Sequence, residues 1–183
     1  YPGESMQKAK PKLLCFSSSL THGRDISYYF HGMIEPYYRA LADQFDLVVL
    51  EPEHNIKSAI LHHSPDAILV DPGPWQKKLQ LPAPQPIRES GLPVMFYSTL
   101  DAQYHSSTVV INYLELLQPD AIFSHDFFHF FYPKKWDLKH VYIPHCYNEE
   151  IFKDYGETKD IMCGFYGHGF FSGNFYPWRR RIV

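Results

Sequence analysis

Short apolar runs alternate with amphipathic segments along most of this chain, and the alternation predicts strands and helices in turn. The apolar runs are rich in branched side chains, which is typical of strands buried on both faces of a parallel sheet. We expect such strands at residues 12–19 (including the small polar residues after the strand), 45–50, 65–72, 92–98, 119–124 and 140–144. Apolar positions three and four apart predict helices at 27–44, 55–63 and 108–118. This order predicts an α/β fold with a doubly wound, mostly parallel, Rossmann-like sheet.

Capping and proline residues refine the expected helices. Pro36 lies inside the first helical pattern and predicts either a kink or a late start of the helix. Asn55 is placed to cap the short helix that runs to His63. Residues 74–91 are rich in Pro, Gln and Lys and lack periodicity, which predicts an extended surface excursion with a short helix at 87–90.

The tetrapeptide Pro-Asp-Ala-Ile occurs twice, at residues 65–68 and 119–122. In both places it follows an expected helix and opens an expected strand. Proline ends the helix, and the aspartate leads into the buried strand. We interpret the repeat as architecture without chemistry.

Composition and charge narrow the class of protein. The chain has 183 residues, of which 45% are hydrophobic and 17% aromatic, so it is globular and long enough for a sizeable core. A net charge of −3 gives no general attraction to nucleic acid. Two of the three cysteines fall in apolar runs, which predicts buried thiols in a reducing compartment, and no run is long enough to span a membrane. We therefore expect a cytoplasmic protein, with residues 1–11 as a disordered tail.

Candidate chemistry lies in the segments that follow the expected strands, because ligands of a doubly wound sheet bind at the carboxyl ends of its strands. The loop after the first strand contains His22, Gly23 and Arg24, which serve either as a mobile turn or as an acceptor site. Asp101 follows the fourth strand, as a helix cap or as a catalytic group. His125 and His129 have the spacing of a metal pair, but no third ligand is evident, so we predict no metal.

The end of the chain is rich in glycine and then in arginine. Residues 160–169 read Asp-Ile-Met-Cys-Gly-Phe-Tyr-Gly-His-Gly, and residues 176–183 read Tyr-Pro-Trp-Arg-Arg-Arg-Ile-Val. A strand, a glycine loop and the start of a basic helix together form a common phosphate site. The loop does not match the dinucleotide-binding pattern Gly-x-Gly-x-x-Gly. We expect the chain to hold one domain and the beginning of another.

The segments around this junction carry a family resemblance. Residues 142–152 (Tyr-Ile-Pro-His-Cys-Tyr-Asn-Glu-Glu-Ile-Phe), 159–167 and 176–180 follow the order of motifs at the domain junction of GT-B glycosyltransferases. They are most similar to the CgeB-like group, in which a "D-[IV]-x-F-x-G" strand precedes a "Y-P-x-R" run. Residues 121–126 resemble the group's fifth-strand segment. Asn148 stands where the group often has Asp, and the matching positions are Phe152 and Gly167.

The resemblance implies a two-domain sugar transferase whose active site lies between the domains. Residues 12–157 would form the acceptor-side domain, and 158–183 would begin the nucleotide-sugar domain. A sugar would pass from a nucleotide sugar to a hydroxyl of a glycan, lipid or protein acceptor, without a further cofactor. The implied site residues are His22 and Asp101 for catalysis; Gly23, Arg24, His125 and Asp126 for the acceptor; and Gly167, Gly169, Arg179 and Arg180 for the donor phosphate.

Two other functions stay open at this point. A non-catalytic, flavodoxin-like module or receiver would need a phosphorylatable aspartate after the third strand, where Asp71 stands. It would also need an acidic pair after the first strand, and residues 13–19 supply none. A nucleotide-dependent epimerase of GT-B shape would use the same sheet. We expect this stretch of chain by itself to be inactive in sugar transfer.

Overall fold

The computed structural model describes residues 9–17, 35–72, 81–98, 107–124 and 139–143. The chain divides into the units Tyr1–Asn148 and Glu149–Val183, and all described residues belong to the first. The elements in chain order are β1 (Lys12–Ser17), α3 (Glu35–Gln44), β2 (Asp46–Leu50), α4 (Ile56–His63), β3 (Ala67–Asp71), α5 (Pro84–Arg88), β4 (Val94–Ser98), α6 (Ser107–Leu117), β5 (Ala121–Ser124) and β6 (Lys139–Tyr142).

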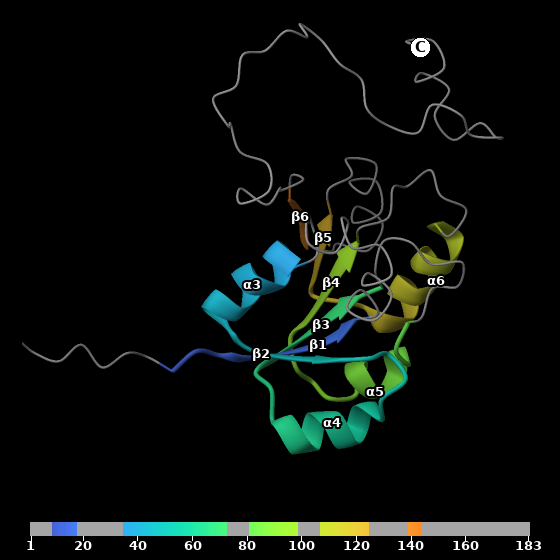
Figure 1. The fold of residues 1–183 in the computed structure, drawn as a ribbon. Helices are drawn as coiled ribbons and strands as arrows, with labels where there is room; N and C mark the ends of the chain where they lie inside the picture. The colour runs from blue at the N-terminus through green and yellow to red at the C-terminus, as the bar shows by residue number, and fades with distance from the viewer. Residues whose placement is uncertain (1–8, 18–34, 73–80, 99–106, 125–138, 144–183) are drawn as a thin grey trace, which may run out of the picture. The chain divides into compact units, whose positions relative to one another are not determined.

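The six strands form one sheet in the order β2-β1-β3-β4-β5-β6, and every neighbouring pair is parallel. Helices flank this sheet (Figure 1). The fold is therefore a Rossmann-like α/β fold, and the prediction of a doubly wound parallel sheet is confirmed.

The helices lie on two faces because the chain changes direction across the sheet. From β1 the chain steps to β2 on one side, and from β2 onward it moves toward β6 on the other side. Right-handed crossovers then require the β1–β2 connection to lie on the face opposite to the later connections. In agreement, α3 packs on one face, through Tyr38, while α4, α5 and α6 pack on the other, through Ile56, Ile87 and Leu114. We call these the α3 face and the α4–α6 face.

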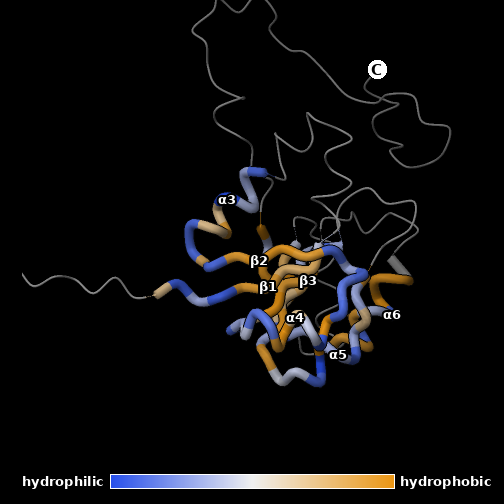
Figure 2. The backbone as a smooth tube through the Cα atoms, turned by 60° about the horizontal axis from the view of Figure 1, so that its bottom comes forward, coloured by the Kyte–Doolittle hydropathy of each residue, from blue (hydrophilic) through white to orange (hydrophobic). Residues whose placement is uncertain are grey.

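The core follows from the alternation of side chains along the strands. In β1, Leu14 and Phe16 point to the α4–α6 face, and Leu13 and Cys15 point to the α3 face. Figure 2 shows β1, β2 and β3 largely in the orange of hydrophobic residues. The side chains of Phe16 and Phe96 are fully buried. Truncation of either to alanine in such a core costs about 3–5 kcal/mol.

Two of the described helices contain proline and bear on the expected ones. The described part of the first helix spans Glu35–Gln44 and includes Pro36, and the rest of the expected helix, residues 27–34, lies outside the described residues, so its start stays a prediction. The short helix expected at 87–90 instead spans Pro84–Arg88, because proline in the first turn presets the helical φ angle. Asn55 does cap α4, since its side chain accepts a hydrogen bond from the backbone N–H of Ser58 at 3.0 Å.

The repeated Pro-Asp-Ala-Ile segments join helix to strand in the same way. Each is preceded by a residue in the left-handed region, Ser64 with φ 45° and Gln118 with φ 49°. The carboxylate of Asp66 accepts a hydrogen bond from the backbone N–H of Lys12, the first residue of β1, at 2.7 Å. The carboxylate of Asp120 accepts one from the N–H of Val94, the first residue of β4, also at 2.7 Å. Each aspartate thus ties the start of the neighbouring strand to its own.

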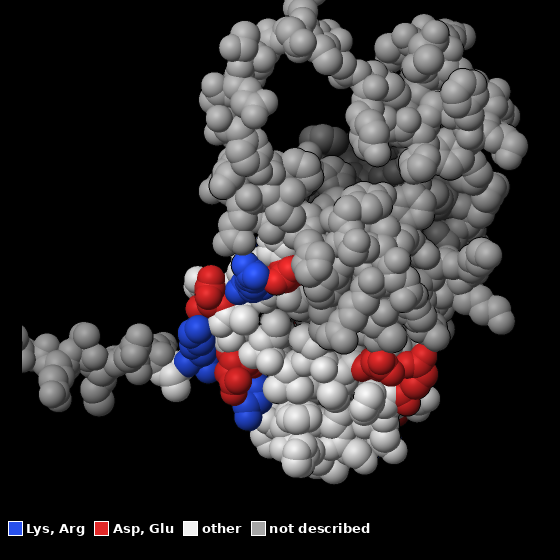
Figure 3. Space-filling view, in the orientation of Figure 1, with Lys and Arg blue, Asp and Glu red and all other residues white. Residues whose placement is uncertain are grey.

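The charge and apolar patterns add two observations. Figure 3 shows Lys and Arg side chains interspersed with Asp and Glu side chains around α3, without a patch of one sign over that helix. Within the described ranges, no helix has the length and apolar character needed to cross a membrane.

The two aspartates give a test of this junction. We expect Asp120→Ala to lower the free energy of unfolding by about 1.5–3 kcal/mol, because a partly buried charged hydrogen bond is lost. The exposed Asp66→Ala should cost less, about 1 kcal/mol. Urea unfolding measures both values. Asp120→Asn keeps an acceptor oxygen, so a loss as large as that of the alanine variant would contradict this account.

Candidate functional site at the carboxyl edge of the sheet

The strand order reverses between β1 and β3, and this is where doubly wound sheets bind ligands. From β1 the chain crosses the α3 face, whereas from β3 it crosses the α4–α6 face. The two strands end side by side, with Ser17 paired in register with Asp71. Their carboxyl ends are therefore the candidate site within the described residues.

A buried carboxylate lies at this position. Asp71 is only 2% exposed, and its Oδ2 atom accepts two hydrogen bonds from side-chain hydroxyls. The Ser17 hydroxyl donates from β1 at 3.0 Å, and the Tyr38 phenol donates from α3 at 2.7 Å. The Cys15 thiol lies 3.8 Å from the same phenol oxygen. We call Cys15, Ser17, Tyr38 and Asp71 the Asp71 cluster.

The sequence positions these groups through strand alternation and helix periodicity. Cys15, Ser17 and Asp71 occupy α3-face positions of adjacent parallel strands. Tyr38 is the buried residue of α3 and faces the sheet. A buried tyrosine needs a partner for its hydroxyl, and a carboxylate that no solvent reaches needs donors. The Tyr38 hydroxyl and the Asp71 carboxylate therefore supply each other's hydrogen-bond partner.

Burial and the Asp71 charge together control the protonation of the cluster. Burial, and then the negative charge of Asp71, raise the pKa of the Cys15 thiol well above its usual value. The same two causes raise the pKa of the Tyr38 phenol well above its usual value. Both groups therefore stay protonated at neutral pH. Neither is a nucleophile in this state, because a thiolate or phenolate would have to form beside a carboxylate.

Aromatic side chains continue from the Asp71 cluster across the α3 face of the sheet toward β4. Tyr97 of β4 follows Asp71 on the α3 face, and its ring stacks on Tyr37 of α3 with centroids 4.6 Å apart. Tyr37 also meets Tyr38 edge to face at 5.3 Å. Both stacked rings are half-buried. The first turns of α3 are thus held against β1, β3 and β4 by aromatic contacts as well as by the Asp71 hydrogen bonds.

A second polar pair lies near the other end of the sheet. Ser124, the last residue of β5, is fully buried, and its hydroxyl lies 2.9 Å from Nε2 of His140 on β6. Burial lowers the pKa of His140 below its ordinary value, so the imidazole is neutral at pH 7. A serine beside a neutral histidine has the composition of a nucleophile–base pair. The burial of Ser124, however, keeps its hydroxyl from any substrate, and the pair serves to satisfy two polar groups in the sheet.

None of the residues predicted for the site lies within the described ranges. By sequence, His22, Gly23 and Arg24 follow β1, Asp101 follows β4, and His125 and Asp126 directly follow β5. Gly167, Gly169, Arg179 and Arg180 come after β6 and also lie outside the described residues, as does His129. Their assigned roles stay predictions. Among the residues that the structure does describe, no group of His, Cys, Asp or Glu could hold a metal ion.

Two features of the site do not follow from the sequence reasoning. Tyr38 is predicted only as one apolar position of a helix, and His140 only as the start of a strand. A signal for Tyr38 is available, because a tyrosine on the buried side of a helix needs a polar partner and Asp71 is the acid that ends the third strand. The Ser124–His140 contact has no such signal, because it depends on the register of β5 with β6.

Comparison of this chain with known protein families, with curated proteins and with solved structures found no match.

Removing the Asp71 carboxylate tests how much the cluster stabilises the fold. We expect Asp71→Ala to lower the free energy of unfolding by about 3 kcal/mol or more, because two buried hydroxyls lose their acceptor. Asp71→Asn retains one acceptor oxygen and should lose less. Tyr38→Phe removes one donor and should cost about 1–2 kcal/mol. Equal stability of the alanine variant and the native chain in urea unfolding would contradict this role.

The raised pKa values predict a loss of stability in alkali. For Cys15 and Tyr38 the folded pKa exceeds the unfolded one, so above the unfolded pKa the unfolded chain releases a proton that the folded chain keeps. The free energy of unfolding then falls by about 1.4 kcal/mol per pH unit for each group. The loss should begin near pH 8.5 for Cys15 and near pH 10 for Tyr38. Burial raises the pKa of Tyr113 in the same direction.

Unfolding by urea at a series of pH values measures this loss. Cys15→Ala removes the titrating thiol and should abolish the first phase while it leaves the phase above pH 10 in place. A native chain whose stability is constant from about pH 8 to about pH 11 would contradict the assigned protonation states.

Proposed function

We propose that residues 12–157 form the acceptor-side domain of a GT-B glycosyltransferase, which moves a sugar from a nucleotide sugar to a hydroxyl acceptor. The parallel Rossmann-like sheet supports this proposal, because each half of such an enzyme is built on a sheet of this kind. The same sheet hosts many other chemistries, so the proposal depends on the segments that leave it. The motifs at 142–152, 159–167 and 176–180 carry the resemblance to the CgeB-like group.

The observation that carries the proposal is the common edge at which the strands end. Because β1, β4 and β5 are parallel members of one sheet, their last residues, Ser17, Ser98 and Ser124, lie at the same edge. The segments that follow these three strands contain the ionisable residues predicted for the acceptor side. Groups from loops far apart in sequence can therefore act on one bound acceptor.

The proposed chemistry needs a base on this side of the cleft and positive charge on the other. His22 or Asp101 would take the proton of the acceptor hydroxyl. The backbone N–H groups at Gly167 and Gly169, with Arg179 and Arg180, would stabilise the leaving diphosphate. No metal or further cofactor takes part in this scheme. The buried free thiol of Cys15 is in keeping with a reducing compartment, and we place the reaction in the cytoplasm.

One observation favours a second candidate, a non-catalytic flavodoxin-like module. The order β2-β1-β3-β4-β5 is the strand order of flavodoxin-like folds. A phosphorylated receiver of that shape needs an accessible aspartate at the end of the third strand. Asp71 has the right position, but it is 2% exposed and accepts hydrogen bonds from Ser17 and Tyr38. Its burial argues against phosphorylation, and we rank this candidate second.

Titration of the chain with nucleotide sugars and with hydroxyl acceptors tests the proposal. We expect glycan, lipid-linked or peptide acceptors to shift the backbone amide resonances of Ser17, Ser98 and Ser124, the strand ends at the proposed acceptor edge. Nucleotide sugars should leave these resonances in place. His22→Ala and Asp101→Ala should lower kcat by about 10²–10⁴ in a form of the protein that carries both sides of the cleft.

Val94, which starts β4, provides an internal control, because its amide lies at the opposite edge of the sheet and should not respond. A nucleotide sugar that binds at the carboxyl edge of β1 and β4 more tightly than every acceptor tested would refute the acceptor-side assignment. Phosphorylation of Asp71 by acetyl phosphate, detected by mass spectrometry, would support the receiver instead.

A further inference from the structure

The strand β2 forms one edge of the sheet, and among the described strands its neighbour is β1 alone. Backbone N–H and C=O groups of successive residues point to opposite sides of a strand in a parallel pair. The N–H of Asp46 donates to the carbonyl of Pro11, which precedes β1, at 2.9 Å, so the even-numbered residues of β2 bond toward β1. The N–H and C=O groups of Leu47 and Val49 therefore point away from the sheet.

The side chains of this edge strand are apolar on both faces. The run Leu-Val-Val-Leu at residues 47–50 is half-buried. Leu47 and Val49 pack against the cluster that contains Tyr38 of α3, and Val48 and Leu50 pack against the cluster on the α4–α6 face. Both apolar layers of the sheet thus reach this edge and stay partly open to water there.

The two edges of the sheet differ in how they are protected from pairing. β6 reads Lys-His-Val-Tyr, and its first and last residues, Lys139 and Tyr142, are exposed. A lysine on an edge strand disfavours the addition of another strand. Residues 47–50 of β2 contain neither a charge nor a proline, and their register with β1 is continuous. A further strand is therefore expected at β2.

The geometry of the β2 edge restricts what can bind to it. Outward N–H and C=O groups at every second residue are matched by the extended backbone of another strand. The side chains add a second requirement, because a strand with one polar face would leave one of the two apolar layers open to water. The partner strand is therefore apolar on both faces, as the buried strands of parallel sheets are. β2 itself meets this requirement.

We propose that β2 pairs antiparallel with β2 of a second copy of the chain, across a two-fold axis that is perpendicular to the sheet. With Val48 on the axis, Leu47 of each copy lies opposite Val49 of the partner subunit. Each of these opposite pairs exchanges two hydrogen bonds, so every outward group of both residues is satisfied. The symmetry also joins the α3 face of one copy to the α3 face of the other. The half-buried side chains of both layers are then covered.

Charge and size set the expected affinity. Asp46 is the charged residue of β2, and it lies two positions from the axis. The two Asp46 carboxylates are therefore about 13 Å apart along the strands, which exceeds the screening length of about 8 Å. A strand of five residues with its adjoining side chains buries less than the roughly 1,200 Å² of a standard interface. We expect a reversible dimer with a dissociation constant on the order of 100 µM.

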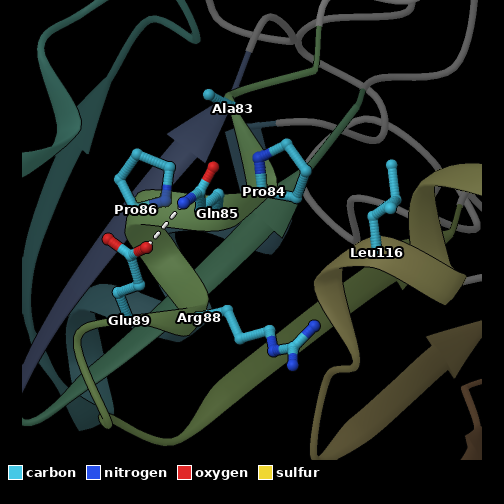
Figure 4. A pocket seen from close by; sticks show the side chains of 7 residues that line it. All are labelled: Ala83, Pro84, Gln85, Pro86, Arg88, Glu89 and Leu116. Atoms are coloured by element: carbon cyan, nitrogen blue, oxygen red, sulfur yellow. Dashed lines mark hydrogen bonds between the residues drawn. The ribbon is translucent and has the colours of Figure 1, made fainter.

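Sedimentation equilibrium and NMR of the whole chain test this dimer without a substitution. Between about 20 and about 500 µM protein, the paired fraction should rise from about one quarter to about three quarters. We expect the amide resonances of Leu47 and Val49 to move over this range, because their N–H groups gain hydrogen bonds. The amide of Leu116 is the internal control. Leu116 lies on α6, beside a hollow that residues of α5 also line (Figure 4), and its resonance should stay in place.

A proline in β2 tests the pairing itself. Val49→Pro removes an N–H group that points away from β1, and edge strands tolerate proline at such positions. We expect the dissociation constant to rise by about tenfold or more, because the symmetric dimer loses two hydrogen bonds. Val49→Thr keeps the N–H group and the branched shape and should retain most of the affinity.

Leu116→Asp is the control for surface charge. It changes a side chain that is 60% exposed on α6, and it should leave the dissociation constant unchanged. Circular dichroism and urea unfolding of each variant show that the fold is kept. If Val49→Pro does not fold, the amide resonances of the native chain decide.

Three results would overturn the proposal. The first is a chain that stays monomeric up to about 500 µM. The second is a dimer in which the amide resonances of Leu47 and Val49 do not move, or which a folded Val49→Pro variant leaves intact. The third is a dimer that Leu116→Asp weakens, because the interface would then lie on α6.

Discussion

The Asp71 carboxylate connects the three elements that define the candidate site. It belongs to β3, and it accepts hydrogen bonds from Ser17 of β1 and Tyr38 of α3. A carboxylate removed from water is tolerated only where donors replace its solvation, so this geometry leaves little freedom to either strand end or to the helix. The chain segments that follow β1 and β3 therefore start from strand ends that are fixed relative to each other. A sheet edge that binds a ligand through several loops needs such fixed starting points.

The same interaction explains why the cluster itself is unreactive. The negative charge of Asp71 and the lack of solvent keep the neighbouring phenol and thiol protonated. Two histidines, His22 and His125, occur in the sequence in the segments that follow β1 and β5. The Asp71 cluster is thus a buried layer that holds the strand ends in place, and the residues proposed to act on a substrate come from the segments that follow the strands.

The two faces of the sheet are stabilised differently. On the α4–α6 face, three described helices cover a large apolar cluster that includes Phe16, Val70 and Phe96. On the α3 face, the one described helix contributes Tyr38 to a smaller cluster, and polar and aromatic contacts lie at its carboxyl end. The order of the strands explains this difference. The chain moves toward the β2 edge of the sheet only in the step from β1 to β2, and in every later step it moves toward β6, so only the β1–β2 connection crosses the α3 face. The face with few described helices is also the face that carries Asp71.

The class of fold could be predicted from the sequence, since branched apolar runs alternate with helical patterns and the Pro-Asp-Ala-Ile repeats end one element and start the next. It also indicated the buried thiol of Cys15 and the cap at Asn55. Three contacts could not be predicted in this way: Tyr38 and Ser17 share the Asp71 carboxylate, Asp120 accepts a hydrogen bond from the amide of Val94, and the Ser124 hydroxyl lies against His140. Each of these contacts joins residues that are distant in the chain, and the pairing order and register of the strands bring them together. Local patterns of polarity set the period of an element, but they carry no information on which neighbour lies beside it.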